Sequence, residues 1–218
     1  MRKRNLMIGA AVAAAGAGAV TAYAYGIRPW HLRWGATDEE LDAPLIGDEL
    51  VARPKLKATH AITINAPAAD VWPWLVQMGQ NRGGFYSYTW LENLVGCHMR
   101  NANRIVPEWQ NLKAGDKVWL HPKAPPVEVA AIEPGCAIVL KPWGAFVLRP
   151  IDENTTRLII RSQGEYEPDL NSAVLNFLLW RMFYEPAHFI MERKMLLGIK
   201  ARAEQLARER AGTVTAAW

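Results

Sequence analysis

The sequence predicts an α+β domain in which an antiparallel sheet is covered by a long C-terminal helix, with a separate hydrophobic helix at the N-terminus. Three features predict it. Short strands separated by turn signals follow one another between residues 114 and 163. An apolar pattern of helical period extends over roughly residues 172–208. An uncharged apolar stretch occupies residues 6–27.

The composition of the 218-residue chain indicates a globular protein, because half of its residues are hydrophobic and 21% are charged. The net charge is +4, and part of this excess lies in the Arg-Lys-Arg run at residues 2–4. No cluster of basic and aromatic residues follows, so we do not expect nucleic-acid binding. Cys97 and Cys136 lack metal-ligand spacing, and no phosphate loop or dinucleotide fingerprint occurs. We therefore expect two free thiols, no metal site and no cofactor.

The N-terminal segment from Leu6 to Ile27 carries no charge and is long enough to cross a bilayer as a helix. We interpret it as a single-pass membrane anchor, with Tyr23, Tyr25 and Trp30 at the membrane border. One alternative is a secretory signal cleaved near Ala22-Tyr23-Ala24, which would leave a secreted domain. Another is a soluble amphipathic helix, against which the missing polar face argues. By the positive-inside rule, the basic residues before the segment place the folded domain outside the cytoplasm.

The rest of the chain divides by composition and pattern. A junction rich in proline, glycine and charge leads to an alternating strand at 59–64, and helical patterns follow at 68–77 and 88–95. The boundaries that we predict are an N-terminal segment at 1–27, a junction at 28–57, the folded domain at 58–208 and a tail at 209–218.

The last predicted strand, at 155–163, separates its side chains into two faces. Leu158 and Ile160 share one face, whereas Arg157, Ile159 and Arg161 share the other. We expect the face with the two arginines to be solvated and the face with the two aliphatic residues to need an apolar cover. The C-terminal helix is the element that can supply this cover.

The C-terminal helical pattern contains two polar residues within its apolar stripe. Pro186 interrupts the pattern, so we expect a kink or two helical segments there. Beyond it, His188 and Glu192 lie one turn apart on the same side as Met195 and Ile199. Both polar side chains are therefore expected to face the sheet.

The chemistry of His188 and Glu192 has two interpretations. In the first, the pair projects into a cavity, where the glutamate orients the imidazole and the histidine acts as a catalytic acid or base. In the second, the pair is structural and pins the helix to the sheet, or to Arg149 or Arg161. A buried carboxylate needs a partner in either case, because leaving it unpaired costs several kcal/mol.

The order of strand, two helices, antiparallel strands and long C-terminal helix resembles the helix-grip fold, in which a curved antiparallel sheet wraps around a long C-terminal helix. The local sequence resembles the START-related superfamily, or SRPBCC, in a polyketide cyclase/dehydratase-like branch to which no reaction is assigned. The resemblance covers roughly residues 28–208. The stretches that carry it are WHLRWGATDEE (30–40), ITINAPAADVWPWLVQMGQNRGGFYSYTWLENLVG (62–96), NANRIVPEWQ (101–110), FVLRP (146–150), TRLIIRSQ (156–163) and EPAHFIMERKMLLGIK (185–200).

This resemblance implies an apolar cavity between the sheet and the long helix that holds a lipid, a polyketide or another hydrophobic small molecule. The ligand-binding residues that we predict are Trp74, Phe85, Tyr86, Tyr88, Trp90, Met191 and Met195. The function that we favour is a membrane-tethered domain that binds a hydrophobic small molecule. The alternatives are a cyclase- or dehydratase-type enzyme that uses His188 and Glu192, and a structural or interaction protein whose cavity is closed.

Overall fold

A computed structural model of the chain describes residues 2–51, 53–164 and 177–215. Its centre is one six-stranded antiparallel sheet with the order β1-β6-β5-β4-β3-β2. The strands are β1 (Leu56–Ile64), β2 (Lys117–Val118), β3 (Val127–Glu133), β4 (Ala137–Lys141), β5 (Gly144–Asp152) and β6 (Thr155–Gly164). The helices are α1 (Arg2–Ala22), α2 (Arg28–Leu32), α3 (Asp38–Asp42), α4 (Ala68–Val76), α5 (Thr89–Leu94) and α7 (Glu185–Thr215). Short 3₁₀ turns occur at Asp48–Leu50 (η2) and Pro107–Trp109 (η3), and π-helical segments at Tyr23–Ile27 (η1) and Phe177–Tyr184 (η4).

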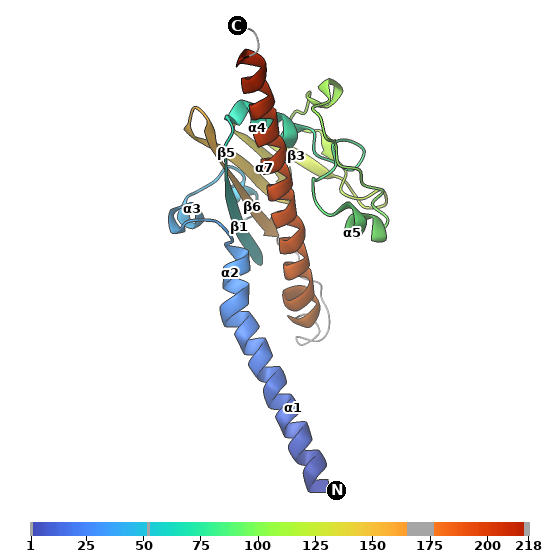
Figure 1. The fold of residues 1–218 in the computed structure, drawn as a ribbon. Helices are drawn as coiled ribbons and strands as arrows, with labels where there is room; N and C mark the ends of the chain where they lie inside the picture. Colours follow the sequence, from blue (N-terminus) through green and yellow to red (C-terminus); the bar gives the residue numbers. More distant parts are fainter. Residues whose placement is uncertain (1, 52, 165–176, 216–218) are drawn as a thin grey trace.

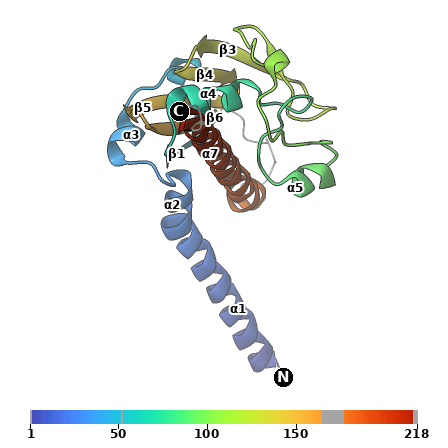
Figure 2. The same ribbon diagram turned by 45° about the horizontal axis from the view of Figure 1, so that its top comes forward.

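Helix α7 lies across the inner face of the sheet, and the strands arc around it (Figures 1 and 2). This is the α+β helix-grip arrangement that the sequence predicts. The predicted division into two segments occurs at Pro186: the π-helical η4 ends at Tyr184 and α7 begins at Glu185, so the proline lies in the first turn of α7. The helix continues to Thr215, through most of the predicted tail, while residues 172–176 of the predicted helix lie outside the described residues.

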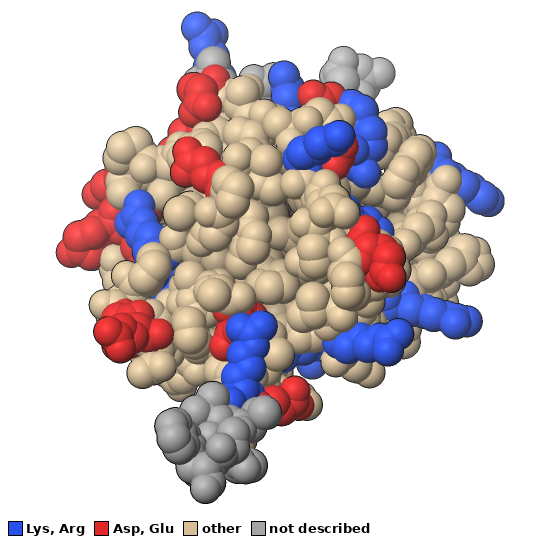
Figure 3. All heavy atoms as spheres, turned by 90° about the horizontal axis from the view of Figure 1, so that it is seen from above, with Lys and Arg blue, Asp and Glu red and all other residues tan. Residues whose placement is uncertain are grey.

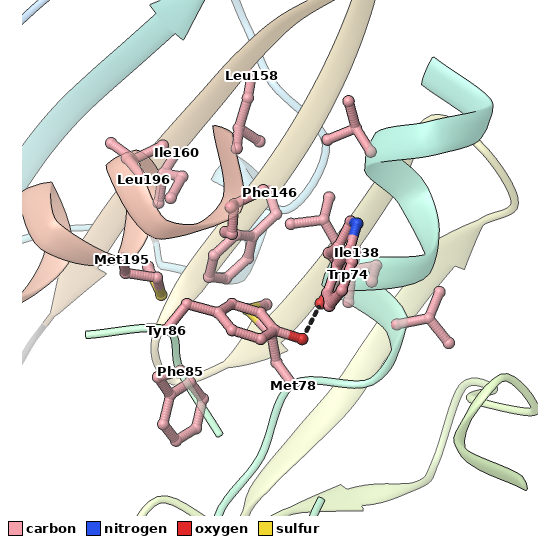
Figure 4. Close-up of a cluster of buried hydrophobic side chains, with 14 of the residues drawn as sticks. Trp74, Met78, Phe85, Tyr86, Ile138, Phe146, Leu158, Ile160, Met195 and Leu196 are labelled. Carbon is pink, nitrogen blue, oxygen red and sulfur yellow. Dashed lines mark hydrogen bonds between the residues drawn. The ribbon is translucent and has the colours of Figure 1, made fainter. Parts of the chain in front are cut away.

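The main core fills the space between α7, α4 and the inner face of the sheet. Leu158 and Ile160 of β6 pack there with Leu196 and Ile199 of α7, and all four side chains are buried. The predicted division of β6 into two faces is confirmed. Figure 4 shows this cluster, in which the Tyr86 hydroxyl donates a hydrogen bond of 3.0 Å to the backbone carbonyl of Trp74.

The outer face of β6, which we expected to be solvated, is covered. Residues 34–50 fold back over it, and Ile159 packs with Leu45 and Ala61 in a second apolar cluster. Arg161 is only 1% exposed. Its guanidinium donates to the carbonyls of residues 40, 41 and 43, to the Asp48 carboxylate at 2.6 Å and to the Thr59 hydroxyl. The expectation that this face is solvated was wrong. The junction covers it and supplies backbone carbonyls that accept hydrogen bonds from Arg161, and the alternation of residues within a strand cannot reveal such partners.

The N-terminal helix leaves the domain as an extended rod on the side opposite the C-terminus (Figure 1). Its stretch Met7–Leu32 is long and apolar enough, by length and composition, to cross a membrane. The last turns pair in parallel with the start of the C-terminal helix. Tyr23 bonds to the Arg181 carbonyl, Arg28 forms a salt bridge of 2.7 Å with Glu185, and Trp30 stacks edge-on against Phe189.

Charged side chains on the face drawn in Figure 3 are interspersed, and neither lysine and arginine nor aspartate and glutamate form a continuous field there. Among the described residues, several charged side chains form ion pairs, for example Lys117 with Glu128 across the β2–β3 pair. The positively charged side chains on this face therefore do not form a single basic patch.

Helix α7 contacts the loop of Tyr86 so closely that only glycine fits at position 198. A Cβ added to Gly198 would lie 2.2 Å from the Tyr86 carbonyl oxygen. We expect Gly198→Ala to lower the free energy of unfolding by about 1–3 kcal/mol, since helix and loop must separate. Thermal unfolding of the detergent-solubilised full chain measures this change.

Gly212→Ala in the same helix is the matched control, because no atom lies within 4 Å of its added Cβ. There the better helix propensity of alanine should stabilise the protein by up to about 1 kcal/mol. Equal effects of the two substitutions would contradict the proposed close approach.

Candidate functional site

Two adjoining hollows lie beside α7. The smaller has a volume of about 170 Å³, and its lining includes Phe85, Glu92, Cys97, Met99, Met191 and Met195. The larger has a volume of about 480 Å³, and its lining includes Leu50, Leu56, Val127, Pro142, Trp180 and Tyr184. Leu120, Trp143 and His188 line both hollows, so the two meet at these side chains. The larger one has the size of typical sites for small organic ligands.

The linings are mainly apolar, but they include polar atoms without a hydrogen-bond partner. Among the described residues, these include the Glu92 Oε2 atom and the Trp143 Nε1 atom, both buried. Burial raises the pKa of the Glu92 carboxyl to about 7. Both residues line the smaller hollow, but these two atoms are almost inaccessible, so the surface that the hollow presents is nearly all apolar.

Glu192 lies at the centre of a buried polar cluster between α7 and the sheet. Its Oε1 atom is 2.6 Å from His60 Nδ1, and its Oε2 atom accepts a hydrogen bond of 2.8 Å from the Ser162 hydroxyl. His188 Nε2 lies 3.5 Å from Oε2. The other ring nitrogen of His60 donates to the carbonyl of His31 at 2.7 Å. The cluster thus joins α7, two neighbouring strands and the N-terminal helix.

The electrostatics of this cluster favour a charged pair of His60 and Glu192. Burial alone would lower the pKa of His60, but the hydrogen bond to Glu192, the charge of that carboxylate and the bond to the His31 carbonyl raise it. Burial alone would raise the pKa of Glu192, but His188 and the hydrogen bonds from His60 and Ser162 lower it. Both oxygens of the carboxylate are occupied by these partners.

His60 is the member of this buried cluster that the sequence reasoning missed. It lies on β1, opposite Ile160 of β6, so its side chain shares the inner face with the core residues. The signal was present in the alternation of the predicted strand at 59–64, where a histidine occupies an inward position. The partner that we expected for Glu192 on the sheet, Arg149 or Arg161, is not used. Arg161 bonds on the outer face, and Arg149 is exposed.

The predicted pair of His188 and Glu192 is adjacent, but the two side chains differ in surroundings. The Glu192 side chain is 1% exposed, whereas that of His188 is 22% exposed and lines both hollows. The His188 ring stacks on Tyr184, which also lines the larger hollow. His188 therefore borders both hollows, and its Nε2 atom lies 3.5 Å from the Glu192 carboxylate.

The predicted ligand-binding residues divide into three groups. Phe85, Met191 and Met195 line the smaller hollow. Trp74 and Tyr86 belong to the hydrophobic core, where their rings pack edge-on at 5.8 Å. Tyr88 is half-buried beneath the Lys194 ammonium, and Trp90 is 65% exposed on α5. Aromatic character alone did not separate these surroundings, because core, rim and surface all use such residues.

Metal ligation is not supported by the described part of the chain, where no three His, Cys, Asp or Glu side chains gather closely enough to hold an ion. Cys97 and Cys136 are both free cysteines. The His188 imidazole is the ionisable side chain that borders both hollows, next to mainly apolar surface.

Comparison with known proteins gives a weak match among solved structures. No protein-family model matches the chain, and no curated protein matches it. Among solved structures, the chain is similar to a polyketide-cyclase-like protein from Corynebacterium glutamicum determined by solution NMR. The two are 14% identical, the match covers 72% of this chain and 93% of that chain, and the TM-score is 0.30.

Replacing His60 should be strongly destabilising, because it leaves a buried carboxylate without its closest partner. We expect His60→Ala to lower the free energy of unfolding by about 3–5 kcal/mol, measured by thermal unfolding of the detergent-solubilised full chain. The double variant His60→Leu/Glu192→Met should recover much of this loss, since it removes both charges together. A small effect of His60→Ala would show that the ion pair does not hold α7.

The same pair predicts a pH dependence of stability. Glu192, whose pKa is lowered from 4.5, stabilises the fold above pH 4.5 and loses this effect as the pH falls through its folded-state pKa. His60, whose pKa is raised from 6.5, stabilises the fold below pH 6.5 and loses this effect as the pH rises through its folded-state pKa. The stability difference between wild type and His60→Gln should therefore be greatest between pH 4.5 and 6.5. His98→Gln, an exposed histidine, is the control and should show no such maximum.

Proposed function

We propose that this protein is a membrane-tethered domain that binds a hydrophobic small molecule between the sheet and α7. The observation that carries the proposal is the pair of adjoining hollows of about 170 and 480 Å³ with mainly apolar linings. A solid core would fill such space, because empty volume forfeits packing interactions. An apolar guest restores these interactions and leaves water, which favours binding.

The tether is the N-terminal helix. Its apolar length supports a transmembrane anchor, and Tyr25, Ile27 and Trp30 are exposed on its last turns, where aromatic side chains suit a membrane–water interface. Exposed Leu179 and Phe183 on η4 extend this apolar surface at the same end of the domain. In this arrangement Tyr184 of η4, which lines the larger hollow, lies at the end of the domain that faces the membrane.

The position of His188 favours a second candidate, an acid–base enzyme of the cyclase or dehydratase type. His188 is the ionisable group shared by both hollows, and Glu192 holds its ring from the protein side. In such an enzyme the imidazole would exchange the proton with the substrate, and Glu192 would be a positioning residue. Turnover that is lost in a folded His188→Ala variant would distinguish this candidate from simple binding.

Filling the joint between the hollows should prevent binding. Leu120 lines both, so Leu120→Trp places a larger ring in the space that a guest needs. We expect wild-type protein extracted in mild detergent to carry a lipid-like mass in native mass spectrometry, and the variant to retain at least about tenfold less of it.

Leu94→Trp is the matched control, because Leu94 is 77% exposed on α5 and should leave the bound mass unchanged. Wild-type protein that is repeatedly empty would count against a ligand-binding role, whatever the variants show.

Whether the N-terminal helix acts as a membrane anchor is tested by asking whether the N-terminal residues are retained in the mature protein. We expect the full chain, expressed in membranes, to resist extraction by alkaline carbonate and to retain residues 6–27 in its intact mass, as a spanning helix requires. A mature chain that begins after residue 24 and appears in the soluble fraction would instead identify a cleaved signal.

A further inference from the structure

The outward face of helix α5 is apolar and exposed. Trp90 and Leu94 lie four residues apart, so their side chains share one face of the helix, and they are 65% and 77% exposed. Val95, which follows the last residue of the helix, is 68% exposed. Single apolar side chains on a surface are common, but three large ones within six consecutive residues are typical of a surface that meets a partner.

The exposure of these side chains follows from a firmly held helix and not from a frayed one. Glu92, two residues from both Trp90 and Leu94, lies on the opposite side of α5, where it is buried and lines the smaller hollow. The Asn93 side chain accepts a hydrogen bond from the Met99 N–H at 2.5 Å and donates one to the Met99 carbonyl at 3.1 Å. The fold therefore presents the apolar face of α5 outward.

Helix α5 lies beside the same part of α7 as the end of the N-terminal helix. Directly before α5, the Ser87 hydroxyl donates to the Met191 carbonyl at 2.7 Å. Trp30 of α2 packs edge-on against Phe189, two residues earlier in α7. In Figures 1 and 2, α2 and α5 lie on opposite sides of α7, toward the end of the domain from which the N-terminal helix projects. A membrane that holds this helix is therefore within reach of α5.

The charges around the apolar face favour a lipid surface as its partner. Residues 88–104 contain one carboxyl group, that of Glu92, and it is buried. Arg100 is exposed in the turn after α5, and the Lys194 ammonium lies 5.5 Å above the Tyr88 ring at the start of the helix. Apolar side chains bordered by cations, without an exposed carboxylate, suit the head-group region of a bilayer, where cations meet lipid phosphates.

We propose that α5 is a second membrane contact, in which Trp90, Leu94 and Val95 enter the leaflet that holds the N-terminal helix. The phosphate groups of that leaflet then lie opposite Arg100 and Lys194. The contact rests on the proposed anchor, which keeps this end of the domain at the bilayer, and it adds a fixed orientation. A single helix would let the domain turn about the helix axis, whereas contacts on both sides of α7 determine which face meets the lipid.

The test measures the depth of α5 in a membrane with a spin label. Leu94→Cys is labelled in the full chain carrying Cys136→Ser and placed in nanodiscs of phosphatidylcholine and phosphatidylglycerol. The parent without the new cysteine reports any labelling of the buried Cys97. The label at position 94 should collide with oxygen and lose collisions with an aqueous nickel complex, because oxygen enters lipid and the complex does not.

Matched variants show whether the apolar face causes the insertion. Glu153→Cys labels the exposed β5–β6 turn, toward the C-terminal end of α7, and should collide freely with the nickel complex. Trp90→Ser in the chain labelled at position 94 should restore nickel collisions there, since it removes the side chain best suited to the interface. Ile151→Ser, which changes an apolar residue that is 58% exposed on β5, should leave the depth of the label unchanged.

The remaining outcomes separate this contact from the anchor. Nickel collisions at position 94 as frequent as those at position 153, in protein that has entered the nanodiscs, would overturn the contact of α5 while the anchor stands. A label shielded from both oxygen and nickel and broadened by a second label would assign the face to another copy of the chain, and would also overturn it. Protein that does not enter nanodiscs would overturn the anchor and the contact together.

Discussion

The buried carboxylate of Glu192 is the constraint on which the arrangement of this protein depends. A charge in that position is tolerated only with several partners, and they come from different elements, namely His60 on β1 and Ser162 on β6. Satisfying the carboxylate therefore fixes where α7 lies on the sheet. His60 also bonds to the His31 carbonyl, so the same requirement fixes the end of the N-terminal helix. A purely apolar contact would let the helix slide and fill the space beside it.

Neighbouring residues of β6 perform opposite tasks. Ser162 points inward and bonds to Glu192, whereas Arg161 points outward and holds the chain between α3 and η2 through carbonyl and carboxylate acceptors. Strand β6 is thus held by polar contacts on both of its faces at two adjacent residues. With the sheet held in this way, the hollows beside α7 can persist without collapse of the surrounding side chains, and Glu92 can remain unsatisfied by the protein.

Periodicity accounts for what could be predicted from the sequence. Alternation in β6 and the helical stripe through Glu192 and Met195 depend only on local geometry, and both agree with the structure. The partners of these residues depend on which strands become neighbours, a property that one segment does not encode. His60 could have been found as an inward histidine, but its pairing with Glu192 spans 132 positions. Glu92 gave no signal, because a glutamate in a short helix is usually solvated.

The N-terminal helix packs in parallel against η4 and α7, so a rigid helical connection, and not a flexible linker, joins the N-terminal segment to the domain. From residue 2 to residue 32 the backbone is helical, and the last turns are clamped by the contact of Tyr23 with Arg181 and the salt bridge of Arg28 with Glu185. A lipid carrier that moves between two distant membranes needs a flexible linker between its anchor and its binding domain. If the anchor remains in the bilayer, the stiff connection would hold the domain at a constant height above the membrane, and a ligand of the proposed kind would be exchanged with the adjacent leaflet.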